Sequence, residues 1–209
     1  MSSVDTATTA RYAQPMQPNV EEALLDQARN GNETAFAQLV EAHSEKIIQL
    51  AWRLTGNRSE AEEISQEAFL RFYKSLSRFR GDSSVATWLY RTVSRLAIDH
   101  LRREKVKRKL FLFSQSERQQ ADPIDLAVDP AASPHELLQA RETALRMQRL
   151  LARLPARQKA VFVLRHQEGL PLKQIAGMLG LSEGTVKAHL HRAVSLFRTE
   201  FNELKENMT

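Results

Sequence analysis

The stretch that most constrains the fold is residues 172–192, which read LKQIAGMLGLSEGTVKAHLHR. Counted from Leu172, apolar residues stand at the fourth, eighth and fifteenth positions, with an alanine at the fifth and a glycine at the ninth. Two helices that cross at a steep angle need a small side chain where they touch. The tight turn between them needs a residue that accepts a positive φ angle. The spacing therefore predicts a helix-turn-helix.

Side chains of this motif are expected to divide between an apolar seam and an outward face. The seam residues are Ile175, Leu179, Val186 and Leu190. Ser182 is the expected N-cap of the second helix. The residues expected on the outward face are Lys187, His189, His191 and Arg192. Such a helix presents its N-terminal half to the major groove, so the pattern favours DNA binding over an ordinary helical hairpin with a solvated basic face.

Composition agrees with a helical protein that meets a polyanion. The 209 residues include only seven glycines and seven prolines, and the formal net charge is +5. The absence of cysteine excludes disulfides and thiolate metal sites. The first 20 residues contain no apolar run of signal-peptide length, and no stretch approaches the roughly 18 apolar residues of a membrane span. We therefore expect a soluble cytoplasmic protein with no membrane span.

The fold class expected is all-α, with two helical domains joined by a flexible linker and a helix-turn-helix in the C-terminal domain. We expect a disordered tail over 1–18, the first domain over 19–109, the linker over 110–132 and the second domain over 133–203. The linker is polar after Phe113. Fully extended, its 23 residues would span roughly 75 Å, so the domains need not touch. Its apolar start is expected to pack on the first domain or on a partner.

Helix boundaries of the first domain are predicted from breakers and caps. Gly31-Asn32 and Gly56-Asn57 are expected to separate the first three helices. Asn19 is a candidate cap for the first helix, and Ser59 with Glu62 forms a candidate capping box for the third. On that third helix the inner face is expected to carry Ile64, Ala68 and Tyr73. The face with Glu63, Gln66, Glu67 and Leu70 is either solvated surface or a surface that docks a partner.

The fourth helix, expected from about Val85 to Lys105, ends in a run of cations. Six basic residues lie between Arg102 and Lys109, against one acid. A helix dipole favours cations at the C-terminus, but so large an excess favours a surface that faces phosphates. Trp88 is expected in the core. Phe79, beside a glycine-containing loop, is the aromatic expected to contact an unpaired base.

Two long runs resemble one family, the bacterial sigma factors of the extracytoplasmic-function class. Residues 60–103, EAEEISQEAFLRFYKSLSRFRGDSSVATWLYRTVSRLAIDHLRR, resemble the second conserved region of that family. Residues 154–193, LPARQKAVFVLRHQEGLPLKQIAGMLGLSEGTVKAHLHRA, resemble its fourth. The resemblance implies a non-catalytic subunit of bacterial RNA polymerase that recognises promoters. It would start transcription of a specialised, stress or envelope-type regulon.

The resemblance also implies roles for particular residues. Those expected to dock on a coiled coil of the largest polymerase subunit are Glu63, Ile64, Gln66, Glu67, Phe69 and Leu70. Those expected to bind and melt the proximal promoter element are Phe79, Arg80, Asp82, Ser83, Ser84, Arg91, Arg95, Arg102 and Arg103. Those expected to read the distal element are Lys173, Lys187, Ala188, His191 and Arg192. The implied partners are core RNA polymerase, promoter DNA and an anti-sigma protein that wedges between the domains.

Three positions depart from the family pattern: Ser65 on the docking helix, Arg95 on the melting helix and His189 on the recognition helix. Two other classes of function stay open. A free-standing helix-turn-helix regulator would need a dimer interface or an effector pocket. An enzyme would need a catalytic constellation, but the six histidines are scattered, and His189 and His191 point to different faces of one helix. The sequence predicts no catalytic residue, no metal and no cofactor.

Overall fold

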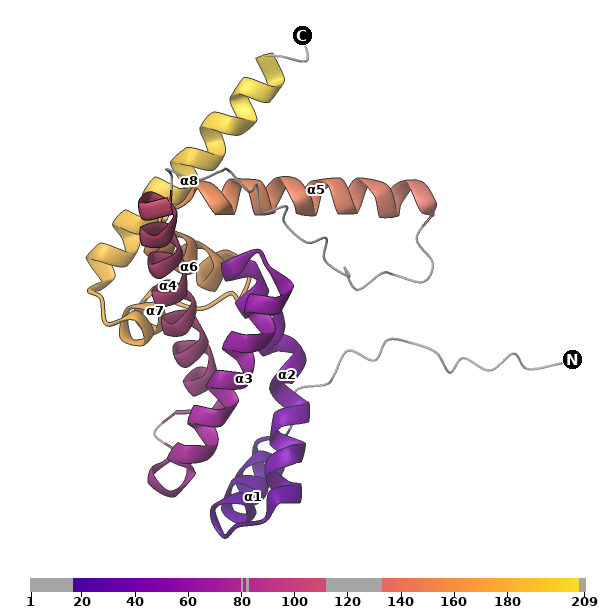
Figure 1. Cartoon of the computed structure of the whole chain (residues 1–209), viewed down its shortest axis with the longest axis vertical. Coiled ribbons are helices and arrows are strands. Elements are labelled where there is room, and N and C mark those ends of the chain that lie inside the picture. Colours follow the sequence, from indigo (N-terminus) through magenta and orange to yellow (C-terminus); the bar gives the residue numbers. More distant parts are fainter. Residues whose placement is uncertain (1–16, 80, 82, 112–132, 207–209) are drawn as a thin grey trace, which may run out of the picture.

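A computed structural model describes residues 17–79, 81, 83–111 and 133–206 (Figure 1). Within these ranges the chain forms eight α-helices and one short 3₁₀ helix, without strands, which confirms the all-α prediction. The first domain consists of α1 (Pro18–Arg29), α2 (Glu33–Thr55), α3 (Arg58–Ser75), η1 (Leu76–Arg78) and α4 (Val85–Phe111). The second consists of α5 (Pro134–Arg153), α6 (Ala156–His166), α7 (Leu172–Leu179) and α8 (Glu183–Glu206). Residues 1–16 and 112–132, most of the predicted tail and linker, lie outside the described ranges.

The core of the first domain forms where α2 packs against α3 and α4. Phe72 is 1% exposed, and its ring lies 5.5 Å from that of Phe79 and 5.2 Å from that of Trp88. The neighbouring Tyr73 is 47% exposed, so the prediction that it belongs to the core is wrong. One residue turns a helix by about 100°, which carries Tyr73 past the buried stripe. Its ring instead covers the edge of Phe36, with centroids 4.9 Å apart.

The observed helix ends contradict two of the predicted N-caps. Gly56 ends α2 with a φ of +81°, and Asn57 then caps α3 by accepting a hydrogen bond from the Glu60 amide at 3.0 Å. Ser59 is therefore already inside the helix that it was expected to start. Similarly, α1 begins at Pro18, so Asn19 lies within its first turn.

The second domain contains the predicted helix-turn-helix, formed by α7 and α8. Gly180 adopts a φ of +65° between the helices, as the tight turn requires. Ser182 caps α8 by accepting a hydrogen bond from the Thr185 amide at 3.1 Å. Ile175 and Val186 are both 0% exposed in the seam between the helices. The predicted apolar seam and N-cap are confirmed.

The two domains lie against one another. Helices α6 and α7 contact α4, α6 also contacts α2, and α5 projects from the body of the molecule (Figure 1). The linker is long enough for the domains to lie apart, but in the structure they share an interface. This interface determines which charged surfaces stay open.

The corrected cap predicts a difference between two mutants of α3. Asn57→Ala should lower the free energy of unfolding by about 0.5–2 kcal/mol, because the Glu60 amide loses its acceptor. Ser59→Ala, at an exposed position, should change it by less than about 0.5 kcal/mol. Urea denaturation of both variants measures the difference. Equal losses, or a larger loss for Ser59→Ala, would contradict the cap.

Candidate nucleic-acid interface

The recognition helix α8 presents one polar face to solvent. Lys187, Ala188, His191 and Arg192 are all exposed, and they form two adjacent pairs one helical turn apart, so they share one side of the helix. The opposite side carries Val186 and Ala193, which are 0% exposed. Lys173, on α7, is also exposed. The structure thus leaves all five residues predicted for the distal element accessible.

His189 differs from its neighbours on α8. Its side chain is half-buried, and its Nδ1 atom is buried without a hydrogen-bond partner. Burial lowers the pKa of His189, and the nearby Arg192 and Arg157 lower it further. The prediction that it lies on the outward face is wrong, because two residues along a helix rotate the side chain by about 200°. At neutral pH the imidazole is therefore uncharged.

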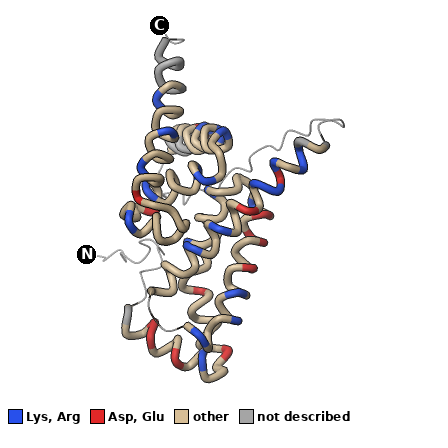
Figure 2. The backbone as a smooth tube through the Cα atoms, turned by 90° about the vertical axis from the view of Figure 1, so that its left-hand side faces the viewer, with Lys and Arg blue, Asp and Glu red and all other residues tan. Residues whose placement is uncertain are grey.

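The basic surface of the first domain follows α4. Arg91, Arg95, Arg102 and Arg103 are exposed, as predicted for residues that face DNA. Figure 2 shows Lys and Arg gathered toward the C-terminal end of this helix. Arg95, however, donates from Nε to the backbone oxygen of Met178 in α7, at 3.3 Å. One of the predicted melting residues is thus in contact with the second domain.

The loop before α4 does not offer Phe79 to a base. Its ring is 9% exposed and packs edge-on against Phe72, and its backbone oxygen accepts a hydrogen bond from Arg29. Phe79 is therefore a core residue here, and its prediction as a base contact is wrong for this conformation. Ser84 is exposed and caps α4 through the Thr87 amide at 3.2 Å.

Of the other loop residues predicted to contact DNA, the structure describes only Ser83. Ser83 is half-buried, while Arg80 and Asp82 lie outside the described residues. The loop is held at its far end by Glu21 of α1, whose carboxylate accepts a hydrogen bond from the Val85 amide at 3.2 Å.

The outer surface of α3 carries most of the residues predicted to dock a partner. Glu63, Gln66 and Leu70 are exposed, and the half-buried Glu67 forms an ion pair with Arg71 at 2.7 Å. Leu70 is 47% exposed, so it offers apolar area to solvent on this surface.

Two residues of that predicted set lie elsewhere. Ile64 is 7% exposed and Phe69 is 9% exposed, so both belong to the core and not to the outer surface. The helical period explains why both are buried. Ile64, Ala68 and Phe72 form one buried stripe along α3, and Ser65 and Phe69 form a second stripe beside it.

The interface between the domains depends on buried charged groups that the sequence analysis missed. Glu168, just after α6, forms an ion pair with Arg53 of α2 at 2.5 Å, and its side chain is only 10% exposed. Burial, with the charge of Glu168 and a hydrogen bond to it, raises the pKa of Tyr90 on α4. A second polar contact joins Gln174 of α7 to Thr87 of α4 at 3.3 Å.

Lys159 of α6 makes the most buried of these contacts. It is 4% exposed and donates from Nζ to the backbone oxygen of Leu54 at 2.9 Å. That oxygen belongs to the last turn of α2, where carbonyls lack partners within the helix and carry partial negative charge. The sequence does contain a sign that Lys159 is buried, because it shares a helical face with the apolar Phe162 and Val163.

Other kinds of site receive no support from the described part of the chain. It contains no cluster of three or more His, Cys, Asp or Glu side chains that could hold a metal ion. None of the helices described is long and apolar enough to cross a membrane.

Comparison with known sequences places both domains. Residues 39–106 match Sigma-70 region 2, and residues 144–196 match Sigma-70 region 4. The chain is 31% identical to the ECF RNA polymerase sigma factor SigW of Bacillus subtilis over 183 residues, which cover 86% of this chain and 96% of SigW. It is 35% identical to SigM of Mycobacterium tuberculosis over 164 residues, which cover 78% of this chain and 75% of SigM.

Solved structures share the fold. CnrH, in complex with the cytosolic domain of CnrY, matches with a TM-score of 0.60 and 22% identity, over 88% of this chain and 98% of CnrH. The sigma factor RpoE of Bartonella quintana, in complex with the anti-sigma factor NepR, matches with a TM-score of 0.59 and 16% identity, over 80% of this chain and 96% of RpoE.

The interface predicts that Glu168→Gln loosens the contact between the domains. A hydrogen bond to a charged group contributes about 1.5–3 kcal/mol, so losing the charge should favour the separated form at least tenfold. Small-angle X-ray scattering should show a larger radius of gyration. Glu183→Gln, at an exposed position of α8, is the matched control and should leave it unchanged. An unchanged radius for Glu168→Gln would show that the ion pair does not hold the interface.

Proposed function

The chain belongs to the extracytoplasmic-function sigma factors, and on that premise we propose that it binds core RNA polymerase, recognises two promoter elements and starts transcription of a specialised regulon. One observation carries the proposal. A single chain presents an exposed basic recognition face on α8, a basic helix α4, and an exposed mixed surface on α3. No chemical step is assigned to the protein, which acts as a non-catalytic subunit in the cytoplasm.

The outer surface of α3 is the proposed polymerase contact. Leu70 lies at its C-terminal end, one turn after Gln66 and Glu67 and two turns after Glu63. An apolar side chain beside polar groups is typical of a protein interface, where apolar groups are desolvated and polar groups set the register. Ile64 and Phe69 contribute by holding α3 in place from the core side.

The proposed contact with the distal element is the outward face of α8. Arg192 and Lys187 carry the charge, and the small Ala188 lets the helix approach the floor of the major groove closely. Arginine and lysine side chains commonly read guanine, with about 1–3 kcal/mol of discrimination per good pair. His191 adds a hydrogen-bonding ring on the same face.

The proposed contact with the proximal element is the exposed side of α4, from Arg91 to Arg103. Its cations would bind phosphates, which position the strand without reading its sequence. Because Arg95 is bound to the Met178 carbonyl in the second domain, this surface is incomplete while the domains stay together. We therefore expect α7 to leave α4 when the protein engages a promoter.

An anti-sigma protein is the proposed inhibitor. CnrH and RpoE, which share this fold, were solved in complex with CnrY and with the anti-sigma factor NepR. A protein that inserted between the two domains would meet the cations of α4 and the surface of α6 together. Charge complementarity makes an acidic segment the expected contact.

Run-off transcription tests the proposed function. Core RNA polymerase would be supplied with pooled promoter fragments, with and without the protein. Initiation at a defined set of sites only in its presence is expected, and the start sites would identify the promoter elements. Tight, specific DNA binding by the protein alone, without initiation, would overturn the proposal in favour of a free-standing regulator.

The distal contact predicts a difference between two arginines of α8. Arg192→Ala should lower promoter affinity of the polymerase complex by about tenfold or more, because a base-reading contact is lost. Arg198→Ala, at an exposed position farther along the helix, should change it less than about twofold. Filter binding or fluorescence anisotropy at one fixed salt concentration measures both. Equal effects would indicate that α8 contributes only general charge.

The polymerase contact predicts an effect of the exposed leucine on α3. Leu70→Ala should weaken binding to core polymerase by about tenfold, since burial of a leucine side chain contributes about 1.5–3 kcal/mol. Ile48→Ala is the control, because Ile48 is also an exposed apolar residue, at 36%, but lies on α2. Surface plasmon resonance with immobilised core enzyme would compare the two, and unchanged binding of Leu70→Ala would exclude this surface.

A further inference from the structure

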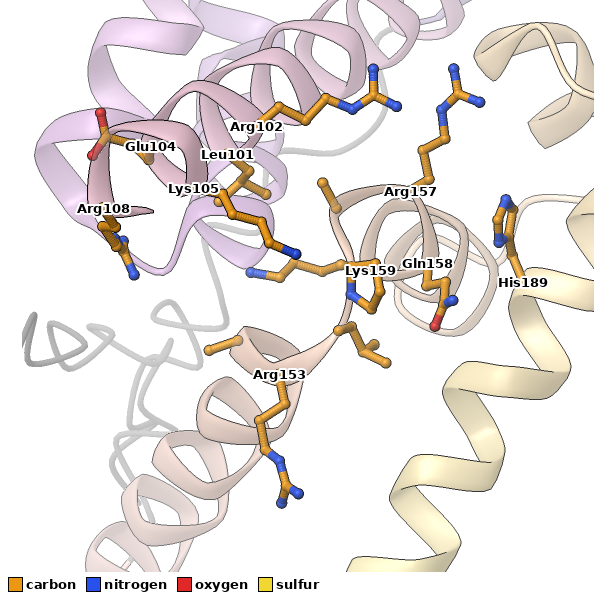
Figure 3. A pocket seen from close by; sticks show the side chains of 14 residues that line it. Leu101, Arg102, Glu104, Lys105, Arg108, Arg153, Arg157, Gln158, Lys159 and His189 are labelled. Carbon is orange, nitrogen blue, oxygen red and sulfur yellow. The ribbon is translucent and has the colours of Figure 1, made fainter. Parts of the chain in front are cut away.

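A cavity of about 610 Å³ lies where the two domains meet (Figure 3). One wall is the C-terminal half of α4, from Leu101 to Arg108. The facing wall is formed by the end of α5, the first turn of α6 and His189 of α8. The cavity therefore exists only while the domains are together.

The lining of this cavity is strongly positive. Its basic residues, three from each domain, are Arg102, Lys105, Arg108, Arg153, Arg157 and Lys159. Glu104 is the one acid among the lining residues, and it is bonded to Lys107 at 2.9 Å. Lys105 and Lys159 point toward each other from the two walls (Figure 3). Like charges that face each other across an interface destabilise it, so the closed arrangement favours an anion between them.

The state of Lys159 reflects this environment. Burial lowers its pKa to about 8, while Glu60 raises it and Arg108 lowers it further. Burial is the largest cause, so the lowered pKa chiefly reflects the shielding of Lys159 from water, and the charge of Arg108 adds to it.

The size and the lining of the cavity favour a small molecule that carries several negative charges. A volume of about 610 Å³ suits a small molecule better than a single inorganic ion. The cations come from three helices, so a ligand must carry several charges to meet cations of both domains. The buried Nδ1 of His189 has no partner, and Gln158 also lines the cavity, so neutral hydrogen-bonding groups are available as well.

The first turn of α6 adds donors to the same wall. Pro155 precedes the helix and makes no side-chain cap, which leaves the first amide N–H groups of α6 available. Such groups favour phosphate oxygens, in agreement with the cations around them.

We propose that this cavity binds a nucleoside polyphosphate, whose phosphates bridge the cations of α4 to those of α6 and hold the two domains together. Because the closed form occupies Arg95 with α7, the ligand would oppose promoter binding; this consequence, but not the binding itself, rests on the proposed function. The position between two domains, with cations on both walls, favours a small compound over a DNA backbone. DNA phosphates are the competing occupant that the experiment has to separate.

Calorimetric titration of the full-length protein with GTP, and with inorganic tripolyphosphate, tests the proposal at constant ionic strength. Saturable binding is expected, with a rise in the unfolding temperature. Lys105→Gln with Arg157→Gln should weaken binding at least tenfold. Both residues are exposed, so the variant should fold, which circular dichroism would verify. Arg149→Gln, an exposed arginine outside the cavity, should leave binding within twofold.

Three results would overturn the proposal. They are no saturable binding of either probe, equal weakening by Arg149→Gln, and binding of a duplex oligonucleotide but not GTP that depends on Lys105 and Arg157. If tripolyphosphate binds as tightly as GTP, the phosphates alone carry recognition and the nucleoside part of the proposal fails. These readouts do not involve transcription, so failure of the sigma-factor proposal and failure of this site are distinguishable.

Discussion

Helix α4 constrains the rest of the structure because its sides must satisfy different surroundings. Val85, Leu89 and Val93 are 0–1% exposed and fix the helix in the core of the first domain. Another side receives α6 and α7 of the second domain. The third side of α4 faces solvent. It carries the exposed arginines and continues into the cationic end of the helix. The contact of Met178 with Arg95 thus covers part of the surface that we propose for DNA.

The interface between the domains includes polar contacts, and these make it suited to opening. It is held by Glu168 with Arg53 and by Lys159 with the Leu54 carbonyl. Such contacts exchange with water and with other polar partners at small net free energy, in contrast to a large apolar interface. The opposing cations of the cavity work against closure. A polymerase, a promoter or an anion can therefore shift the balance with the free energy of a few contacts.

Local patterns predicted the helices, the glycine stops and the helix-turn-helix, because these depend on neighbours in sequence. They chose wrongly between nearby alternatives: both Asn57 and Ser59 have side chains that can cap a helix, and α3 begins after Asn57. They also misplaced Tyr73, Phe79 and His189, because one or two residues along a chain or helix separate a buried from an exposed side. The contact between the domains has no local signature, since its partners lie some 100 residues apart, as Lys159 and Leu54 do.

The most direct test of this account is the distance between the domains before and after an initiation complex forms. The chain has no cysteine, so cysteines introduced at the exposed Ser59 and Ser195 would accept a fluorophore pair selectively. Single-molecule energy transfer should show one short distance in the free protein and a longer one with core polymerase and promoter DNA. An unchanged short distance in a complex that initiates would contradict the account, because α4 would then work while covered by α7.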